Sequence, residues 1–116
     1  MKKLILITSI LLLNNNLIAE VSVEIGKKLF TEQTCNTCHS LDGTKLIGPS
    51  FKGLYNRKGK LTGGAEYLAD DEYLTESILN PQAKLVDGFP PIMIPYKGKL
   101  DTDQVKSLIE YIKTIK

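Results

Sequence analysis

The most constraining feature of the sequence is a pair of cysteines three positions apart, with a histidine directly after the second. These residues are Cys35, Cys38 and His39, and the chain holds no other cysteine or histidine. The C-x-x-C-H spacing is typical of a c-type haem attachment site. In such a site both thiols add to haem vinyl groups as thioethers, and the imidazole ligates the iron. The motif therefore predicts a fold built around one covalently bound haem c.

Two other interpretations of these three residues exist. A C-x-x-C pair can be a thiol–disulfide redox centre, but that function favours a βαβ context, and the sequence shows no such pattern. A closed structural zinc site usually has four Cys or His ligands, whereas this chain has three in all. Haem attachment is the favoured interpretation, with the redox pair and the metal site as alternatives.

The first 19 residues differ from the rest of the chain. Two lysines precede an apolar run over residues 4–13, which three asparagines then interrupt before Ala19. This pattern is typical of a secretory signal peptide cleaved after Ala19. The alternative is an uncleaved membrane anchor, but a spanning helix needs about 20 apolar residues, roughly twice the length of this run. We therefore expect residues 1–19 to be a signal peptide and the protein to be periplasmic, with its folded domain at 20–116.

Charge and size limit what the exported chain can bind and how it can fold. The whole chain has 15 basic and 13 acidic residues, and removing residues 1–19 leaves 13 basic residues (15 − 2) against the same 13 acidic ones. A formally neutral chain lacks the broad basic field typical of nucleic-acid binding. The chain has three phenylalanines, five tyrosines and no tryptophan. Because a small domain has a limited core, we expect a buried porphyrin to complete it and the haem-free chain to fold poorly.

Three segments carry helical signals. Residues 23–33 have apolar positions at helical spacing ahead of the cysteine motif. A second helix is predicted over 71–79, because Asp70 can cap its start and Asn80-Pro81 can end it. The last helix follows Asp101, which has capping-box spacing with Gln104.

The connections between these helices are long and rich in turn signals. Gly63-Gly64, between Leu61 and Tyr67, predicts a small hairpin. Long loops in a compact domain are usually functional or disordered, and wrapping a haem would explain them here. The predicted fold class is therefore all-α, with three main helices and long loops wrapped around one covalently bound haem.

A second iron ligand is predicted at Met93, the only methionine besides Met1. It lies in a loop with three nearby prolines, Pro90, Pro91 and Pro95, which restrict the backbone. Ligation by His39 and Met93 would raise the reduction potential and fill both axial positions, which favours electron transfer over substrate binding. The alternative is that the methionine fills a gap in the core.

Taken together, these residues resemble the class I cytochromes c from about Gly26 to Ile115. The matching pieces, in chain order, are Gly26 and Phe30; Cys35, Cys38 and His39; Gly48-Pro49; Gly53-Leu54-Tyr55-Asn56-Arg57-Lys58; Asn80-Pro81; Met93; and Leu108 with Tyr111. The stretch 70–78, followed by Gly88-Phe89-Pro90 and Met93, is similar to the cytochrome c domains fused to subunit II of haem–copper oxidases. The resemblance implies the cytochrome c fold for residues 20–116.

The resemblance also implies roles for individual residues. Pro49 would offer its carbonyl to the free ring nitrogen of His39, and Arg57 would face a haem propionate; an exposed surface arginine is the alternative. The first and last helices would cross at Gly26. The family often has a tryptophan bonded to a propionate, which this chain lacks. Ser77 stands where many members place a tyrosine near the methionine sulfur.

The predicted function is a periplasmic monohaem cytochrome c that carries single electrons between respiratory-chain components and is not an enzyme. The expected donor is a quinol-oxidising complex, and the expected acceptor is a terminal oxidase or a periplasmic reductase. Loose association with the inner membrane is compatible with this role, and nucleic acid is not an expected partner. Two rivals are a gas-binding or catalytic haem protein in which Met93 does not bind the iron, and a small subunit permanently docked to an oxidase or reductase.

Local patches would have to carry any electrostatic docking to a redox partner. Five lysines are candidates to surround the haem edge: Lys27, Lys28, Lys45, Lys97 and Lys99. The alternative is that these lysines are ordinary solvated side chains.

Overall fold

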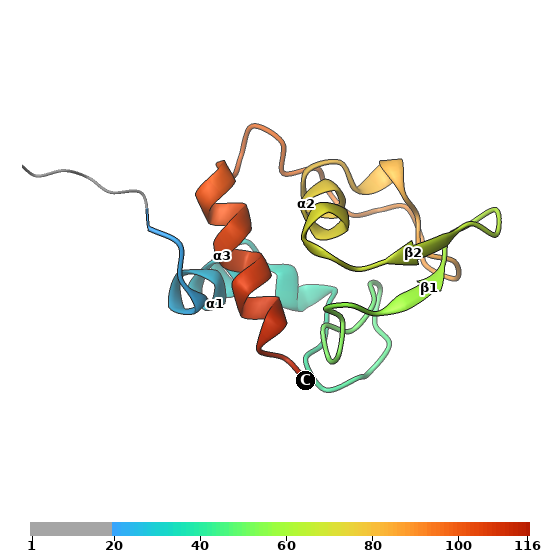
Figure 1. Cartoon of the computed structure of the whole chain (residues 1–116), viewed down its shortest axis with the longest axis horizontal. Helices are drawn as coiled ribbons and strands as arrows, with labels where there is room; N and C mark the ends of the chain where they lie inside the picture. Colours follow the sequence, from blue (N-terminus) through green and yellow to red (C-terminus); the bar gives the residue numbers. More distant parts are fainter. Residues whose placement is uncertain (1–19) are drawn as a thin grey trace, which may run out of the picture.

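The computed structural model describes residues 20–116, so the predicted signal peptide lies outside the described residues. The described chain contains three α-helices, two short strands and two 3₁₀ turns. In chain order these are α1 (Val23–Glu32), η1 (Cys35–Thr37), β1 (Lys58–Lys60), β2 (Glu66–Leu68), α2 (Asp71–Leu79), η2 (Pro81–Ala83) and α3 (Thr102–Lys113). Figure 1 shows α1 and α3 crossing on one side of the molecule, with α2 and the two strands on the other. The predicted fold class is confirmed.

Polar caps set where the helices begin. The Asp70 side chain accepts a hydrogen bond from the Tyr73 N–H at 2.9 Å, and α2 has the bounds predicted from the sequence. At α3, Asp101 and Gln104 exchange side-chain-to-backbone bonds of 2.8 and 3.0 Å and form the predicted capping box. These bonds satisfy N–H groups that have no partner inside the helix. The first helix ends at Glu32, one residue before its predicted end.

A close crossing of α1 and α3 forms the base of the fold. A Cβ atom at Gly26 would lie 1.9 Å from the Ser107 carbonyl oxygen, so only glycine allows the two backbones to come this close. Phe30 packs edge-on against Tyr111, with ring centroids 5.5 Å apart. The predicted crossing at Gly26 is therefore confirmed. This close packing offsets the weak helix propensity of glycine, about 1 kcal/mol relative to alanine.

The predicted hairpin is also confirmed. Strands β1 and β2 pair antiparallel, with Gly59 opposite Tyr67. A Cβ atom at Gly59 would lie 2.7 Å from the Tyr67 ring, so the glycine leaves room for that ring to lie across its strand. Tyr67 then stacks on Tyr73 of α2, with centroids 4.8 Å apart and planes 12° apart. The hairpin and α2 therefore form one wall of the interior.

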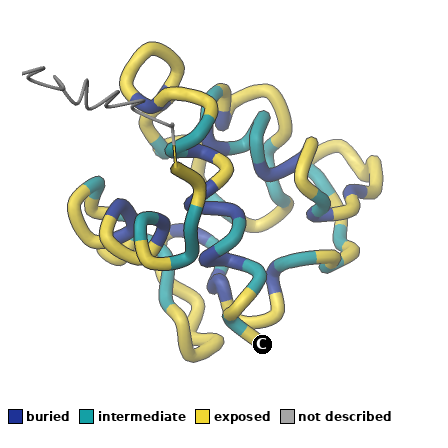
Figure 2. Tube along the Cα trace, turned by 60° about the vertical axis from the view of Figure 1, so that its left-hand side comes forward, coloured by how far each residue is buried: buried dark blue, intermediate teal, exposed yellow. Residues whose placement is uncertain are grey.

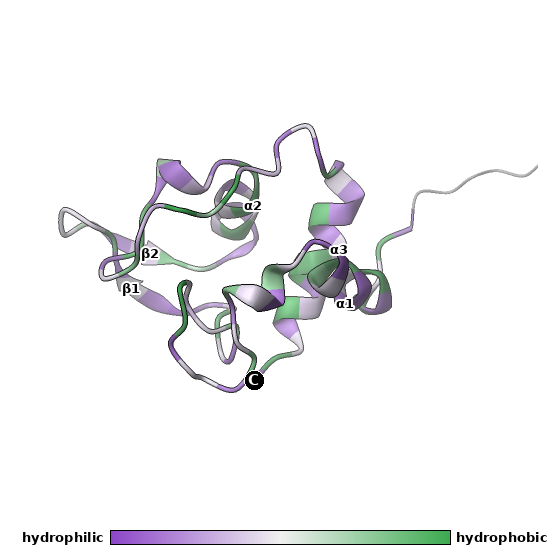
Figure 3. Cartoon of the chain, turned by 180° about the vertical axis from the view of Figure 1, so that it is seen from behind, coloured by the Kyte–Doolittle hydropathy of each residue, from purple (hydrophilic) through white to green (hydrophobic). Residues whose placement is uncertain are grey.

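The interior lies between the α1–α3 pair and this wall. Figure 2 shows the buried stretches on the inner side of the trace, while the loops are mostly exposed. Tyr73, Leu74 and Ile78 form the inner face of α2 and are buried. Figure 3 shows apolar segments on α1 and α3 where the two helices meet. Within residues 20–116, no helix is long and apolar enough to cross a membrane.

Candidate haem-binding site

A cavity of about 350 Å³ opens between the cysteine motif, α2, the segment after α2, and α3. Five of the six predicted site residues line it: Cys35, Cys38, His39, Pro49 and Met93. The rest of the lining is mostly apolar, and includes Phe51, Leu54, Leu74, Ile78, Leu100, Leu108 and Ile112. Residues 58 positions apart in the chain, Cys35 and Met93, thus reach one apolar chamber.

His39 is held in one tautomer. Its Nδ1 lies 2.7 Å from the Pro49 carbonyl oxygen. A carbonyl can only accept a hydrogen bond, so Nδ1 carries the proton of the neutral ring and Nε2 keeps a free lone pair. Burial lowers the pKa of His39, while the bond to Pro49 acts in the opposite direction. The ring is therefore neutral at neutral pH, which is the form that binds a metal.

Packing fixes the plane of the His39 ring as well. A Cβ atom at Gly48 would lie 2.4 Å from His39 Cε1, so a larger residue at position 48 would collide with the ring. On another side, the Phe51 ring lies 4.7 Å away, centroid to centroid. The Gly48 and Phe51 amides donate to the Cys38 and Ser40 carbonyls at 2.9 and 2.8 Å. The segment carrying Gly48, Pro49 and Phe51 is thus folded directly onto the motif.

Sequence reasoning missed the roles of Gly48 and Phe51. The Gly48-Pro49 pair belongs to the resemblance with class I cytochromes c, but its steric reason appears only when the ring contacts are known. Phe51 carries no local signal, because an aromatic residue in a loop is compatible with many kinds of packing.

The two cysteines are held in the short η1 turn. The His39 N–H donates to the Cys35 carbonyl at 2.9 Å, which closes the turn and places the histidine directly after it. Both thiols are free and half-buried. Burial raises the pKa of the Cys35 thiol, and the neighbouring Cys38 raises it further. A reactive redox cysteine usually has a lowered pKa, so this environment does not favour the thiol–disulfide alternative.

Met93 reaches the cavity from a loop that lacks regular structure. The side chain is half-buried and packs against the core. The Gln82 side-chain amide donates to the Pro91 and Met93 carbonyls, each at 3.2 Å. Three residues after the methionine, the Tyr96 hydroxyl donates to the Gln33 carbonyl at 2.8 Å. Sequence reasoning missed Gln82 and Tyr96, because their partners are distant in the chain and leave no periodic pattern.

Arg57, the sixth predicted site residue, lies beside the cavity and does not line it. Its Nη2 donates to the Ser50 and Lys52 carbonyls at 3.0 and 2.7 Å. With Lys45 and Lys52, it lines a smaller, basic cavity. This second cavity shares part of its wall with the first, through Pro49, Tyr67, Val86 and Phe89. The guanidinium is thus anchored by backbone carbonyls at the border of the main cavity.

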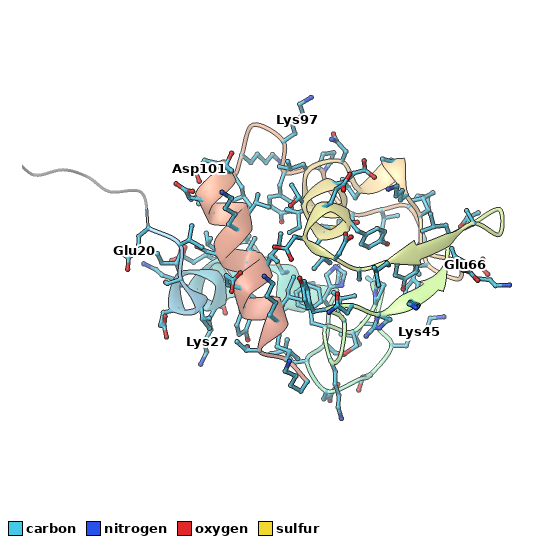
Figure 4. The ribbon with its side chains drawn as sticks, in the orientation of Figure 1. Glu20, Lys27, Lys45, Glu66, Lys97 and Asp101 are labelled. Atoms are coloured by element: carbon cyan, nitrogen blue, oxygen red, sulfur yellow. The ribbon has the colours of Figure 1, made fainter. Side chains whose placement is uncertain are left out.

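The lysines predicted to surround the site do not form one cluster. Lys27, Lys45 and Lys97 point outward at three separate edges of the molecule in Figure 4. Lys45 lies over the Phe89 ring, with its Nζ 4.8 Å from the ring centroid. The other predicted lysines are exposed as well.

The site residues fit a covalently bound haem. The two thiols and the imidazole have the spacing of the attachment motif, and the thioether of Met93 lines the same apolar cavity. The Ser77 hydroxyl is buried at the cavity wall and has no hydrogen-bond partner among the described residues. A buried polar atom without a partner is uncommon, and it fits a chamber shaped for a bound group. The fold and the site together define a small protein that carries one haem on a C-x-x-C-H motif.

Comparison with known proteins agrees with this class of protein. The family model for cytochrome c matches residues 23–116, and the chain belongs to this family. It is 33% identical over 92 residues to cytochrome c2 iso-1 of Magnetospirillum fulvum, covering 71% of this chain and 91% of that one. It is 30% identical over 93 residues to cytochrome c2 of Rhodoplanes tepidamans, with the same coverage of both chains. Cytochrome cH from Methylobacterium extorquens shares its fold, with a TM-score of 0.62 at 21% identity over 80% of this chain and 98% of that chain.

Membership of the family establishes the general role of the chain. It is a class I c-type cytochrome with one covalently attached haem c. It is an electron carrier and not an enzyme, and its partners are redox components of electron-transfer chains.

Proposed function

We propose that Cys35 and Cys38 hold the haem as thioethers, that His39 and Met93 ligate its iron, and that the protein works in the periplasm. The observation that carries this proposal is that all four side chains line one cavity, with His39 fixed by Pro49. His39 and Met93 together would leave no place on the iron for a substrate, which suits electron transfer.

The protein's own groups keep the site the same in both oxidation states. The Pro49 carbonyl retains the Nδ1 proton of His39, so the ligating nitrogen does not change. The mostly apolar walls carry few polar groups that would reorient when the charge changes. The bound haem supplies the one-electron chemistry. Small reorganisation of the surroundings is what a fast electron carrier requires.

Arg57 is proposed to face the haem carboxylates. The basic cavity that it shares with Lys45 and Lys52 borders the main cavity and has no acidic residue in its lining. A guanidinium already oriented by two carbonyls can meet a carboxylate with little further loss of side-chain freedom. The charge-assisted bond would lower the free-energy penalty of burying a carboxylate.

The proposed electron route runs from a quinol-oxidising complex to a terminal oxidase or a periplasmic reductase. The resemblance of residues 70–78 to the domains fused to oxidase subunit II supports an oxidase as acceptor. The signal-peptide pattern of residues 1–19 supports export. Loose association with the inner membrane would keep the carrier close to such partners.

The proposed contact surface lies where the cavity opens to solvent. Ile47, Ile92 and Ile94 line the cavity and yet are 46%, 58% and 52% exposed, so they mark this opening. Lys45 lies close by, over Phe89. If the rate of electron exchange with a redox partner did not change with ionic strength, Lys45 and the other lysines would have no role in docking.

The ferric optical spectrum of the purified protein, beside that of Met93→Ala, tests the proposed ligands. The weak red band typical of sulfur ligation is expected in the unmutated protein and should be absent from Met93→Ala. A high-spin spectrum in the unmutated protein would instead support the gas-binding or catalytic rival. Fractionation of cells tests the location, and firm co-purification with a membrane complex would point to a permanently docked subunit.

A further inference from the structure

The loop that carries Met93 has few hydrogen bonds of its own. Three of its residues are prolines, which have no backbone N–H. Among the described residues, the Met93 and Ile94 amides have no hydrogen-bond partner. The neighbouring side chains Ile92 and Ile94 are more than half exposed. Because the loop makes few hydrogen bonds of its own, contacts from other segments help to keep it against the cavity.

Tyr96 supplies the most buried of these contacts. The residue is only 6% exposed, and its ring lines the cavity. Its hydroxyl donates to the Gln33 carbonyl at 2.8 Å, and its backbone N–H donates to the Ile78 carbonyl at 3.1 Å. Gln33 caps the end of α1, two residues before Cys35. One tyrosine therefore ties the methionine loop both to the segment that leads into the motif and to α2.

The bond from Tyr96 also satisfies the end of a helix. The last carbonyls of an α-helix have no partner within the helix. The described structure gives the Gln33 carbonyl no other donor. If the hydroxyl were removed, this acceptor would lose its protein partner, and the closed loop would lose its advantage over an open one.

Gln82 supplies a second contact, nearer to solvent. Its side-chain amide reaches the Pro91 and Met93 carbonyls, both at 3.2 Å. The side chain is exposed, so water competes for the same groups. Its effect on the loop should be smaller than that of Tyr96.

We propose that Tyr96 and Gln82 are positioning residues that keep the Met93 loop closed over the cavity. They thereby set how readily an external ligand displaces Met93 from the iron. This inference rests on the proposed ligation by Met93. An external ligand can bind only when the loop opens, so its apparent affinity reports the population of the open form.

Titration of the ferric holoprotein with imidazole tests the proposal. A net hydrogen bond changes such an equilibrium by about three- to tenfold, so Tyr96→Phe should bind imidazole about three- to tenfold more tightly. Gln82→Ala should show an increase of about twofold. Tyr55→Phe is the matched control, because it removes a hydroxyl that makes an exposed bond to Asp71, on a partly buried residue that does not line the cavity. Its imidazole affinity should equal that of the unmutated protein.

The outcomes separate this inference from the proposed function. If Tyr96→Phe and Gln82→Ala bind imidazole no more tightly than Tyr55→Phe does, the inference is overturned. The inference is also overturned if Tyr96→Phe and Gln82→Ala lower the thermal midpoint of unfolding but leave the imidazole affinity unchanged. In that case Met93→Ala would still remove the red sulfur band, and the proposed function would stand. If the unmutated protein and Met93→Ala have the same ferric spectrum, the proposed ligation itself fails.

Discussion

The two segments that supply the proposed iron ligands are held in different ways. The proximal segment, residues 35–51, places His39 between Gly48, Pro49 and Phe51, and its contacts are short bonds between partly buried groups. The distal segment, residues 90–96, presents Met93 from a loop held by the buried Tyr96 at its end and by the exposed side chain of Gln82. The fold therefore holds His39 by several contacts and Met93 by few, and we expect only the Met93 loop to open.

This difference follows from what each segment has to do. The proximal segment carries both thiols and the imidazole, so a small shift there would disturb three of the proposed attachment points at once. The distal segment contributes a single neutral thioether. Local opening needs less free energy where few buried contacts are lost. We therefore expect exchange of axial ligands to occur at Met93 and not at His39, and the following predictions test this asymmetry.

The largest effect should come from removing the haem that both segments are proposed to surround. In Cys35→Ala/Cys38→Ala, no thiol remains to hold the haem, and the cavity between the walls would have to stay empty. Because a domain of this size has little other core to lose, the variant should lose most of its helical circular dichroism and show no sharp unfolding transition. A cooperative thermal transition in the haem-free variant would contradict this prediction.

Gly48→Ala should disturb the position of the His39 ring. The new methyl group would lie 2.4 Å from His39 Cε1, so either the ring or the loop must move. Overpacking of this kind typically destabilises by about 1–3 kcal/mol, and here it should also alter the optical spectrum of the iron.

Gly53→Ala is the control for Gly48→Ala. Gly53 has a φ of +64° and no atom within 4 Å of an added Cβ, so the substitution strains only the backbone. It should destabilise by about 1–2 kcal/mol and leave the spectrum unchanged. If Gly48→Ala leaves the spectrum unchanged as Gly53→Ala does, the contacts around His39 do not hold its ring as rigidly as the comparison with Met93 requires.

Amide hydrogen exchange should sharpen the comparison in the unmutated protein. The Gly48 and Phe51 amides donate to the Cys38 and Ser40 carbonyls, so they should exchange slowly. The Met93 and Ile94 amides have no partner among the described residues and should exchange faster, by about tenfold or more. Equal protection of the two segments, measured by NMR on the ferrous protein, would argue against a distal segment that opens first.

The features predictable from the sequence are those encoded over short distances. The capping box of Asp101 and Gln104 spans three positions, so the residue types and their spacing are enough to predict it. The cysteine motif is similarly local. Gly26 is predictable at the helix crossing because a glycine inside a helix needs a packing reason, and the Ser107 carbonyl provides it.

The parts of the site that sequence reasoning missed depend on folding across long distances. The Tyr96 hydroxyl meets a carbonyl 63 residues away, and a backbone acceptor has no identity that a sequence pattern could show. Phe51 contacts His39 because of the path of the loop between them, which no periodicity describes. Arg57 is expected to face a propionate, and the structure adds the two carbonyls that orient it.

The smallest predicted effect concerns an exposed link between the two halves of the molecule. Asp71, at the start of α2, accepts a bond from the Tyr55 hydroxyl and pairs with Lys113 of α3 at 3.3 Å. The Tyr55 bond, with help from Lys113, lowers the pKa of Asp71 below its ordinary value of 3.8. A lowered pKa stabilises the fold above the ordinary value, and this contribution is lost as the pH falls through the lowered one. Because the pair is exposed, Asp71→Asn should lower the thermal midpoint by no more than about 4 °C at pH 7. The difference should shrink as the pH falls below 3.8 and vanish below the lowered pKa of Asp71. A difference that persisted at that acidity would show that Asp71 acts through its shape and not its charge.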